Sequence, residues 1–265
     1  MINLAVLGIT GRMGRALLYV LPEVTDLKLT GALTSPGNAA AGRDVGELIG
    51  TTALGVKASC DRDEVLKGAH VAIDFTLATA VRDNLRACER HRAALVIGTT
   101  ALSDEVRAQL TASATSLPIL VAPNMSLGVA VLEKLSALAA RALDEEFDVD
   151  IVDLHHRDKA DAPSGTALRL GETIAAARGV NFSQSAILSR EGNVGARQRG
   201  KIGFAVVRAG DAVGEHTVHF SGPGETLSLT HRATDRRIFA RGAIRAAQWL
   251  SRQPAGLYSF HNVIN

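Results

Sequence analysis

The sequence predicts an α/β protein of two domains, the first built on a parallel sheet wound with helices and the second a mixed α/β domain. Short apolar runs alternate with longer helical patterns through the first half of the chain, as they do where helices connect parallel strands. After Pro123-Asn124 this alternation stops. Strand-like runs with Gly-rich turns follow, and hairpins or meanders suit them better than crossovers.

The expected strands of the first domain are short runs of apolar or β-branched residues, each buried on both faces. They lie at residues 4–7, 27–33, 71–75, 95–97 and 119–121. Helical patterns between them cover residues 13–21, 80–91 and 103–113. Ser103 is a suitable N-cap for the third helix, with Glu105 close behind it.

The second half begins with a helical pattern at residues 127–143 and a strand in which Phe147, Val149 and Ile151 alternate with polar residues. Further strands are expected at residues 202–207, 213–220 and 226–230, and a final helix at 238–250. We therefore expect a first domain of residues 1–126, to which residues 236–265 return, and a second domain of residues 127–235.

The composition is that of a globular protein, with 265 residues of which 46% are hydrophobic. Lys and Arg number 29 against 27 Asp and Glu, and no basic stretch is interleaved with aromatics, so no nucleic-acid partner is expected. Cys60 and Cys88 cannot make a disulfide framework or a zinc cluster. No basic leader precedes the apolar N-terminal run and no apolar run could span a bilayer, so we expect a cytoplasmic protein without a membrane partner.

A glycine turn, Gly8-Ile9-Thr10-Gly11-Arg12-Met13-Gly14, directly follows the first expected strand. Glycine there lets the backbone approach a pyrophosphate, which the N–H groups of the next helix can bind. The spacing is Gly-x-x-Gly-x-x-Gly rather than Gly-x-Gly-x-x-Gly, so the motif alone is weak. A turn that only packs strand against helix is the alternative. The strand before it and the helix after it favour a Rossmann-type dinucleotide-binding domain.

Three further loops follow buried strands: Asp74-Phe75-Thr76, Gly98-Thr99-Thr100 and Pro123-Asn124-Met125. The carboxyl ends of parallel strands share one edge of the sheet, where ligands bind in such folds. Each loop alone could be ordinary turn chemistry. Together they favour a binding crevice.

The segment from Asp153 to Ala167 concentrates two histidines, an arginine and a lysine at the end of a strand, and then opens a helix. His155 and His156 point to opposite faces if the strand continues through them. Gly165 and Thr166 begin the helix, where backbone N–H groups and a hydroxyl can bind a carboxylate. Lys159 adds a mobile positive charge. The segment predicts a site for a small anion beside a histidine that exchanges protons near neutral pH.

Structural alternatives exist for this segment. Paired histidines can be surface residues, and Asp161-Ala162-Pro163-Ser164 could simply be a helix cap. No acidic or thiol ligand stands at a recognised metal spacing around the histidines, so no metal is expected. The presence of both the glycine turn and this segment favours catalysis.

At this point the chain resembles the 4-hydroxy-tetrahydrodipicolinate reductases, also called dihydrodipicolinate reductases. The resemblance runs essentially end to end, and its most specific motif is His-His followed by Lys-x-Asp-Ala-Pro-Ser-Gly-Thr. It also rests on the glycine turn and on residues 73–76, 96–100, 189–192, 202–211 and 213–217. The resemblance implies a dinucleotide-binding domain joined to a mixed α/β domain that binds substrate and builds a homotetramer.

The resemblance also implies residue roles. His155 and Lys159 match the proton-donating pair, and His156, Gly165 and Thr166 match substrate contacts. The implied reaction is hydride transfer from NADH or NADPH to ring C4 of a dicarboxylate, with loss of its hydroxyl as water. The implied cofactor contacts are Gly8, Ile9, Thr10, Gly11, Arg12, Met13, Gly98, Thr99, Thr100, Ala122, Pro123, Asn124 and Met125.

One departure concerns the choice of cofactor. Where many relatives carry an acidic and then a basic residue after the second strand, this chain has Thr34-Ser35-Pro36. The loss of a carboxylate removes repulsion of the additional phosphate of NADP. The hydroxyls of Thr34 and Ser35 could bind that phosphate, with Arg12 or Arg43 adding charge. We expect both cofactors to work, with a modest preference for NADPH.

Two rival functions share part of this pattern. Another two-domain nicotinamide enzyme, such as an aspartate or homoserine dehydrogenase, would have the first domain but no reason for the segment from His155 to Thr166. A redox-sensing regulator would bind a dinucleotide without turning it over, and its second half should offer a partner surface or a DNA-binding helix.

Overall fold

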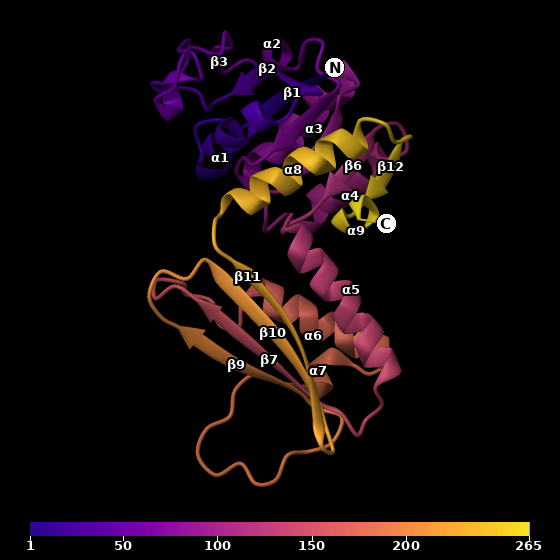
Figure 1. The fold of residues 1–265 in the computed structure, drawn as a ribbon. Helices are drawn as coiled ribbons and strands as arrows, with labels where there is room; N and C mark the ends of the chain where they lie inside the picture. Colours follow the sequence, from indigo (N-terminus) through magenta and orange to yellow (C-terminus); the bar gives the residue numbers. More distant parts are fainter. Residues whose placement is uncertain (265) are drawn as a thin grey trace. The chain divides into compact units, whose positions relative to one another are not determined.

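The computed structural model describes residues 1–264, which form two compact units. The first unit contains Met1–Ser126 together with the residues from Arg237 onward, and the second contains Leu127–Arg236. Figure 1 draws the chain with its strands and helices labelled.

The first unit is built on a sheet of seven strands, all paired in parallel, in the order β12-β6-β5-β4-β1-β2-β3. The five strands expected from the sequence are confirmed to within two residues. The chain goes from β1 to β2 on one side and then to β4 on the other, so the strand order reverses beside β1, the position at which sheets of this kind bind ligands. The bounds are β1 Ile2–Leu7, β2 Leu27–Leu33, β3 Ala58–Ser59, β4 Val71–Asp74, β5 Ala94–Ile97, β6 Pro118–Val121 and β12 Gly256–Tyr258.

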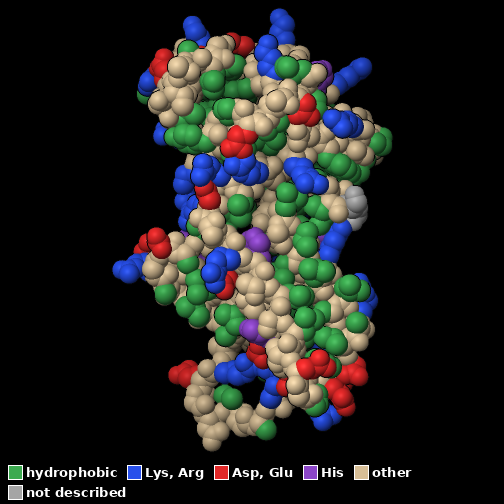
Figure 2. All heavy atoms as spheres, in the orientation of Figure 1, with side chains coloured by type: hydrophobic (Ala, Val, Ile, Leu, Met, Phe, Trp, Pro, Cys, Tyr) green, Lys and Arg blue, Asp and Glu red, His purple; other side chains and the backbone are tan. Residues whose placement is uncertain are grey.

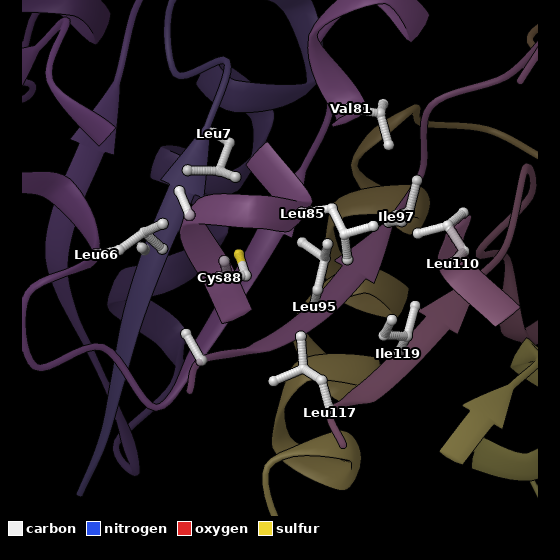
Figure 3. Packing of buried hydrophobic residues seen from close by; sticks show 14 of the residues in the cluster. Leu7, Leu66, Val81, Leu85, Cys88, Leu95, Ile97, Leu110, Leu117 and Ile119 are labelled. Carbon is white, nitrogen blue, oxygen red and sulfur yellow. The ribbon is translucent and has the colours of Figure 1, made fainter. Parts of the chain in front are cut away.

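Helices cover both faces of this sheet. On one face α2, α3 and α4 pack over side chains such as Leu95 and Ile97 of β5, and Figure 3 shows Leu85 and Cys88 of α3 with Leu110 of α4 in this core. On the other face α1 packs against α8, which also contacts β4, β5 and β6. The bounds are α1 Arg12–Val20, α2 Arg62–Leu66, α3 Val81–His91, α4 Asp104–Ser113, α8 Arg237–Leu250 and α9 Phe260–Val263. Ser103 is the N-cap of α4, as expected.

The second unit holds a mixed sheet in the order β11-β10-β7-β9-β8. The hairpin expected around residues 222–224 is present, because β10 and β11 pair antiparallel across that turn. The expectation of hairpins throughout is wrong, since β9 pairs in parallel with both β7 and β8. A parallel connection needs a crossover, and α6 lies in the long segment between β7 and β9. The bounds are β7 Asp148–His155, β8 Ala186–Ile187, β9 Ile202–Arg208, β10 Gly214–Gly222 and β11 Glu225–Ala233.

Three helices belong to this unit: α5 Leu127–Ala142, α6 Gly165–Arg178 and α7 Phe182–Ser185. Helices α5 and α6 lie on one face of the sheet (Figure 1) and share a core with it. Along β7 the buried side chains alternate, with Val149, Ile151, Asp153 and His155 on the helix side. The period of two therefore puts a carboxylate and an imidazole into the same buried layer. Among the described residues, no helix is both long and apolar enough to cross a bilayer.

Candidate active site

The glycine turn follows β1, at the edge of the first sheet where the parallel strands have their carboxyl ends. A Cβ on Gly14 would lie 2.4 Å from the carbonyl oxygen of Gly8, so the first turn of α1 packs directly on the turn backbone. Gly8 has a positive φ of 90°, which favours glycine. Gly11 is the N-cap of α1 and supplies no side-chain acceptor. No cap side chain therefore accepts hydrogen bonds from the first N–H groups of α1. These N–H groups are suited to donate to a bound phosphate.

The loops after β4 and β5 meet beside this turn. A Cβ on Gly98 would lie 2.1 Å from the ring of Phe75, and one on Gly8 would lie 3.0 Å from the Phe75 carbonyl oxygen. The Thr99 hydroxyl donates to the Thr76 carbonyl at 2.9 Å. The structure thus brings both Gly8 and Gly98 into contact with Phe75. The sequence alone placed their three loops only at the same edge of the sheet.

Asp74 stabilises this edge from beneath. Its buried carboxylate accepts hydrogen bonds from the Thr76 N–H at 2.8 Å, the Thr76 hydroxyl at 2.6 Å and the Asn84 amide at 2.9 Å. Burial raises the pKa of Asp74, against the lowering effect of these hydrogen bonds. Asp74 is therefore a support for the loop rather than a group exposed to a ligand.

The segment after β6 lies on the same edge. Ala122 donates its N–H to the Ile97 carbonyl at 2.9 Å, and Asn124 accepts the Ser126 N–H at 2.9 Å. Met125 is buried, and its carbonyl packs so closely on α8 that a Cβ on Gly242 would lie 1.7 Å from it. The backbone of this segment is thus fixed at the end of the strand.

The two residues after β2 differ in their surroundings. Thr34 is only 3% exposed, and its hydroxyl lies 3.2 Å from that of Thr10, whereas Ser35 is exposed. Arg43 makes an ion pair with Glu47 at 3.0 Å. Arg12, the first residue of α1, is exposed.

In the second unit, the end of β7 buries His155 among polar side chains. Its Nδ1 lies 2.8 Å from Oδ1 of Asp153, close enough for an ion pair, although the angle is not that of a regular hydrogen bond. The ring of His216 stands edge-on to that of His155, with centroids 5.1 Å apart. Gly214 leaves room for the other side of the imidazole, because a Cβ there would lie 2.8 Å from Nε2.

The loop that follows holds His156, Lys159 and Asp161. His156 is half-buried just past the end of β7. The Lys159 ammonium donates to the Asp161 carboxylate at 2.8 Å, and this contact lowers the pKa of Asp161. Arg208 donates to the Asp161 carbonyl at 2.6 Å, which ties the loop to β9.

The first turn of α6 is open at Gly165. Ser164 is the N-cap, and its hydroxyl accepts the Ala167 N–H at 3.2 Å, so the helix-cap interpretation of Ser164 is correct. A Cβ on Gly165 would meet nothing within 4 Å. Packing does not require glycine there, and space remains for a ligand above the helix start. Thr166 is half-buried beside it.

Sequence reasoning missed Asp153, Arg208, His216 and Gly214 as members of this cluster. The sheet register brings them together, because His216 pairs with Asp153 across β10 and Arg208 pairs with His155 across β9. One signal was available for Asp153, which stands two residues before His155 and so shares its face of the strand. The other three depend on strand pairings that no local pattern gives.

Asp153, His155 and His216 place possible metal-ligand atoms within 4.8 Å of one another. The same carboxylate, however, lies 3.2 Å from the Arg208 guanidinium and accepts the Ser164 N–H at 2.7 Å. Positive charge and a donor are thus already supplied by the chain, which favours a hydrogen-bonded cluster over a cation site.

Comparisons with known proteins agree with this arrangement. Residues 2–125 match the family model described as dihydrodipicolinate reductase, N-terminus, and residues 128–264 match its C-terminus. A 4-hydroxy-tetrahydrodipicolinate reductase of Syntrophotalea carbinolica is 47% identical over 264 residues, covering 100% of this chain and 99% of the relative. One from Pseudomonas fluorescens is 46% identical over 264 residues, covering 99% and 98%.

Solved structures extend the likeness to the fold. A dipicolinate-bound dihydrodipicolinate reductase from Paenisporosarcina sp. TG-14 aligns with a TM-score of 0.79 at 26% identity and covers 99% of both chains. An amine dehydrogenase from Mycobacterium smegmatis, 17% identical with a TM-score of 0.62 over 98% of this chain and 95% of its own, shares the fold alone. Matches over both halves of the chain, with relatives of nearly equal length, show that it belongs to the dihydrodipicolinate reductase family.

Proposed function

We propose that this chain catalyses the reduction of 4-hydroxy-tetrahydrodipicolinate to tetrahydrodipicolinate by NADPH or NADH, in the diaminopimelate route of lysine biosynthesis. The observation that supports it most is the segment at the end of β7, where a buried histidine is followed by a lysine and by the open start of α6. Full-length relatives named for this activity, at 43–47% identity, support the same assignment.

The first unit would bind the nicotinamide dinucleotide that the family and its Rossmann-type fold imply. Gly8, Gly11 and Gly14 let the pyrophosphate approach the backbone, and the N-terminus of α1 offers it N–H groups. The remaining contacts would come from residues 9, 10, 12 and 13, from Gly98, Thr99 and Thr100, and from residues 122–125. The bound cofactor supplies the hydride.

The second unit would bind the dicarboxylate. The half-buried Lys159 ammonium contacts the exposed Asp161 carboxylate at 2.8 Å, and a substrate carboxylate can take the place of that exposed acceptor. Gly165 and Thr166 begin α6, where N–H groups bind the other end of an anion. We assign His156, half-buried just past the end of β7, as a further donor.

His155 would be the acid of the reaction. Loss of the hydroxyl as water leaves a conjugated imine, and hydride arrival at C4 puts negative charge on that conjugated system. One proton must then be added, and an imidazole with one nitrogen against a carboxylate is suited to deliver it from the other. Lys159 would share this proton donation while it holds a carboxylate. In total the reaction consumes one hydride and one proton and releases one water.

A turnover assay with alternative substrates tests the proposal. Freshly generated substrate should cause NADPH oxidation by the wild-type protein, and His155→Ala should lower kcat by roughly 10²–10⁴-fold while dinucleotide affinity changes little. Turnover of aspartate or homoserine instead would favour the rival dehydrogenases. Dinucleotide binding without any turnover would favour the sensor.

The site also supports a modest cofactor preference. The residues directly after β2, Thr34 and Ser35, carry no carboxylate that would repel a 2′-phosphate. The Thr34 hydroxyl is engaged with Thr10, and Arg43 is paired with Glu47. Ser35 and Arg12 remain as the exposed candidates. We expect NADPH to be favoured by roughly tenfold or less in kcat/KM, about 1.4 kcal/mol or less.

We also propose a homotetramer assembled through the second sheet. The face opposite α5 and α6 is not covered by any helix of the second unit, and it presents Val152, Leu154, Ala205 and Val207. This open face also carries polar pairs such as Thr217 with Thr230, and a mixed sheet face left open in this way is suited to burial against other subunits. A monomer in light scattering at micromolar concentration would refute the assembly.

A further inference from the structure

One carboxylate lies at the centre of the second unit's polar cluster. Asp153 is completely buried, yet four elements of the fold meet at its two oxygens. Oδ1 faces Nδ1 of His155 at 2.8 Å and Nε2 of His216, on β10, at 3.4 Å. Oδ2 accepts the Ser164 N–H at 2.7 Å and the Arg208 guanidinium at 3.2 Å. The two oxygens therefore have separate tasks, one toward the histidines and one toward the scaffold.

The surroundings keep this carboxylate ionised. Burial raises the pKa of Asp153, but the adjacent His155, His216 and Ser164 outweigh that effect, and the net pKa lies below its ordinary value. A buried charge is tolerated only with such partners. An ionised acceptor is thus present at Nδ1 of His155 throughout the neutral pH range.

A hydrolytic triad does not explain the cluster, although Ser164, His216 and Asp153 are its residue types. In such a triad the histidine binds the serine and the aspartate through opposite ring nitrogens. Here the same atom, Nε2 of His216, faces both Ser164 Oγ at 3.1 Å and Asp153 Oδ1 at 3.4 Å. The Ser164 hydroxyl also caps α6. The group is arranged for positioning and not for nucleophilic attack.

We propose that Asp153 is a positioning residue for the acid His155. Its Oδ1 keeps the proton of the neutral imidazole on Nδ1, so that Nε2, on the side of Gly214, is the nitrogen that gives up and regains the reacting proton. Its Oδ2 holds the start of α6 through Ser164, and Arg208 joins the same oxygen to the Lys159 loop. One buried side chain thereby fixes the acid relative to the anion-binding helix start. This inference rests on the proposed function.

The variant Asp153→Asn separates the task of Oδ1, which faces His155, from that of Oδ2, which holds Ser164 and Arg208. The amide oxygen can still accept from Ser164 and Arg208, while the amide nitrogen faces the histidines and donates where Asp153 accepts. The neutral imidazole of His155 should then carry its proton on Nε2. By analogy with the carboxylate of a catalytic triad, whose amide variant leaves the wrong tautomer, kcat should fall by roughly 10²–10⁴-fold. KM and dinucleotide affinity should change several-fold at most.

Two readouts decide the inference. In ¹⁵N-histidine NMR spectra of the full-length protein, the His155 signals, assigned with His155→Asn, should move from an Nδ1–H to an Nε2–H pattern in Asp153→Asn. Ser164→Ala is the matched control, because it removes the α6 cap and leaves Oδ1 opposite His155; it should affect KM and thermal stability and leave the His155 nitrogen pattern unchanged.

An unchanged His155 pattern in a folded Asp153→Asn variant, or kcat within twofold of wild type, would overturn the inference. If the variant does not fold, the wild-type spectrum decides, since an Nε2–H pattern in neutral His155 would contradict the assigned role. A wild-type protein that shows the expected nitrogen pattern but does not turn over the substrate would instead overturn the proposed function.

Discussion

Gly214 offers a sharp test of the position of His155. In Gly214→Ala the new methyl would lie 2.8 Å from Nε2, 3.2 Å from Cδ2 and 3.6 Å from Cε1 of the imidazole, whereas ordinary contacts begin at 3.4 Å. The ring must therefore move by about 0.6 Å, and it is buried against Asp153 and His216. Because a misplacement of about 1 Å can cost roughly 10²-fold in rate, we expect kcat to fall by roughly 10- to 100-fold. Crowding should also destabilise the fold by about 1–3 kcal/mol.

The assay is steady-state reduction with a double-mutant cycle. If the methyl acts through His155, Gly214→Ala should cost little further kcat in a His155→Ala background. Dinucleotide affinity, a property of the other unit, should be unchanged in both backgrounds. Wild-type kcat in Gly214→Ala would contradict this expectation. So would an equal loss of kcat from Gly214→Ala in the wild-type and His155→Ala backgrounds.

Three further predictions concern other parts of the chain. Lys159→Ala should lower kcat and raise KM, and Lys159→Arg should restore neither fully, because a planar guanidinium replaces a compact ammonium; normal kinetics in the arginine variant would show that charge alone suffices. Ser35→Asp should shift the kcat/KM ratio toward NADH by tenfold or more through repulsion of the 2′-phosphate, and Ser35→Asn should not. Because burial raises the pKa of Asp74, the folded chain holds this proton to a higher pH than the unfolded chain, so the contribution of Asp74 to the free energy of unfolding should fall as pH rises above about 4. Denaturant titrations of wild type and Asp74→Asn across that range should show the difference, and parallel pH curves would contradict it.

Much of the fold was predictable because short stretches of sequence determine most of its strands and helices. The buried strands 95–97 and 119–121 are continuous apolar runs, and Ser103 marks a helix start by its capping chemistry. β3 and β12 escaped prediction because two or three residues at a sheet edge leave no pattern. The parallel pairing of β7 with β9 escaped it because a period of two indicates a strand and says nothing about its neighbour.

The residues of the candidate site also fall into those that a local segment reveals and those that only strand pairing brings together. His155, Lys159 and Gly165 stand in one continuous segment whose chemistry is visible in the sequence. Asp153 was within reach of the same reasoning, but its role depends on Arg208 and His216, which reach it from other strands. For Thr34 the fold adds what the sequence could not give, since its hydroxyl is buried against that of Thr10, and its contact with the cofactor stays a prediction. Long-range register decides each of these cases.

The most direct test of the central claim follows a deuterium label from the cofactor to the product. NADPH deuterated at the transferable position of its nicotinamide ring is incubated with the protein and freshly generated 4-hydroxy-tetrahydrodipicolinate, and the product is analysed by mass spectrometry and NMR. We expect one deuterium per molecule of tetrahydrodipicolinate, located at ring C4, and a rate of label transfer that falls in parallel with kcat in His155→Ala. A product without deuterium, or with deuterium at another carbon, would contradict it.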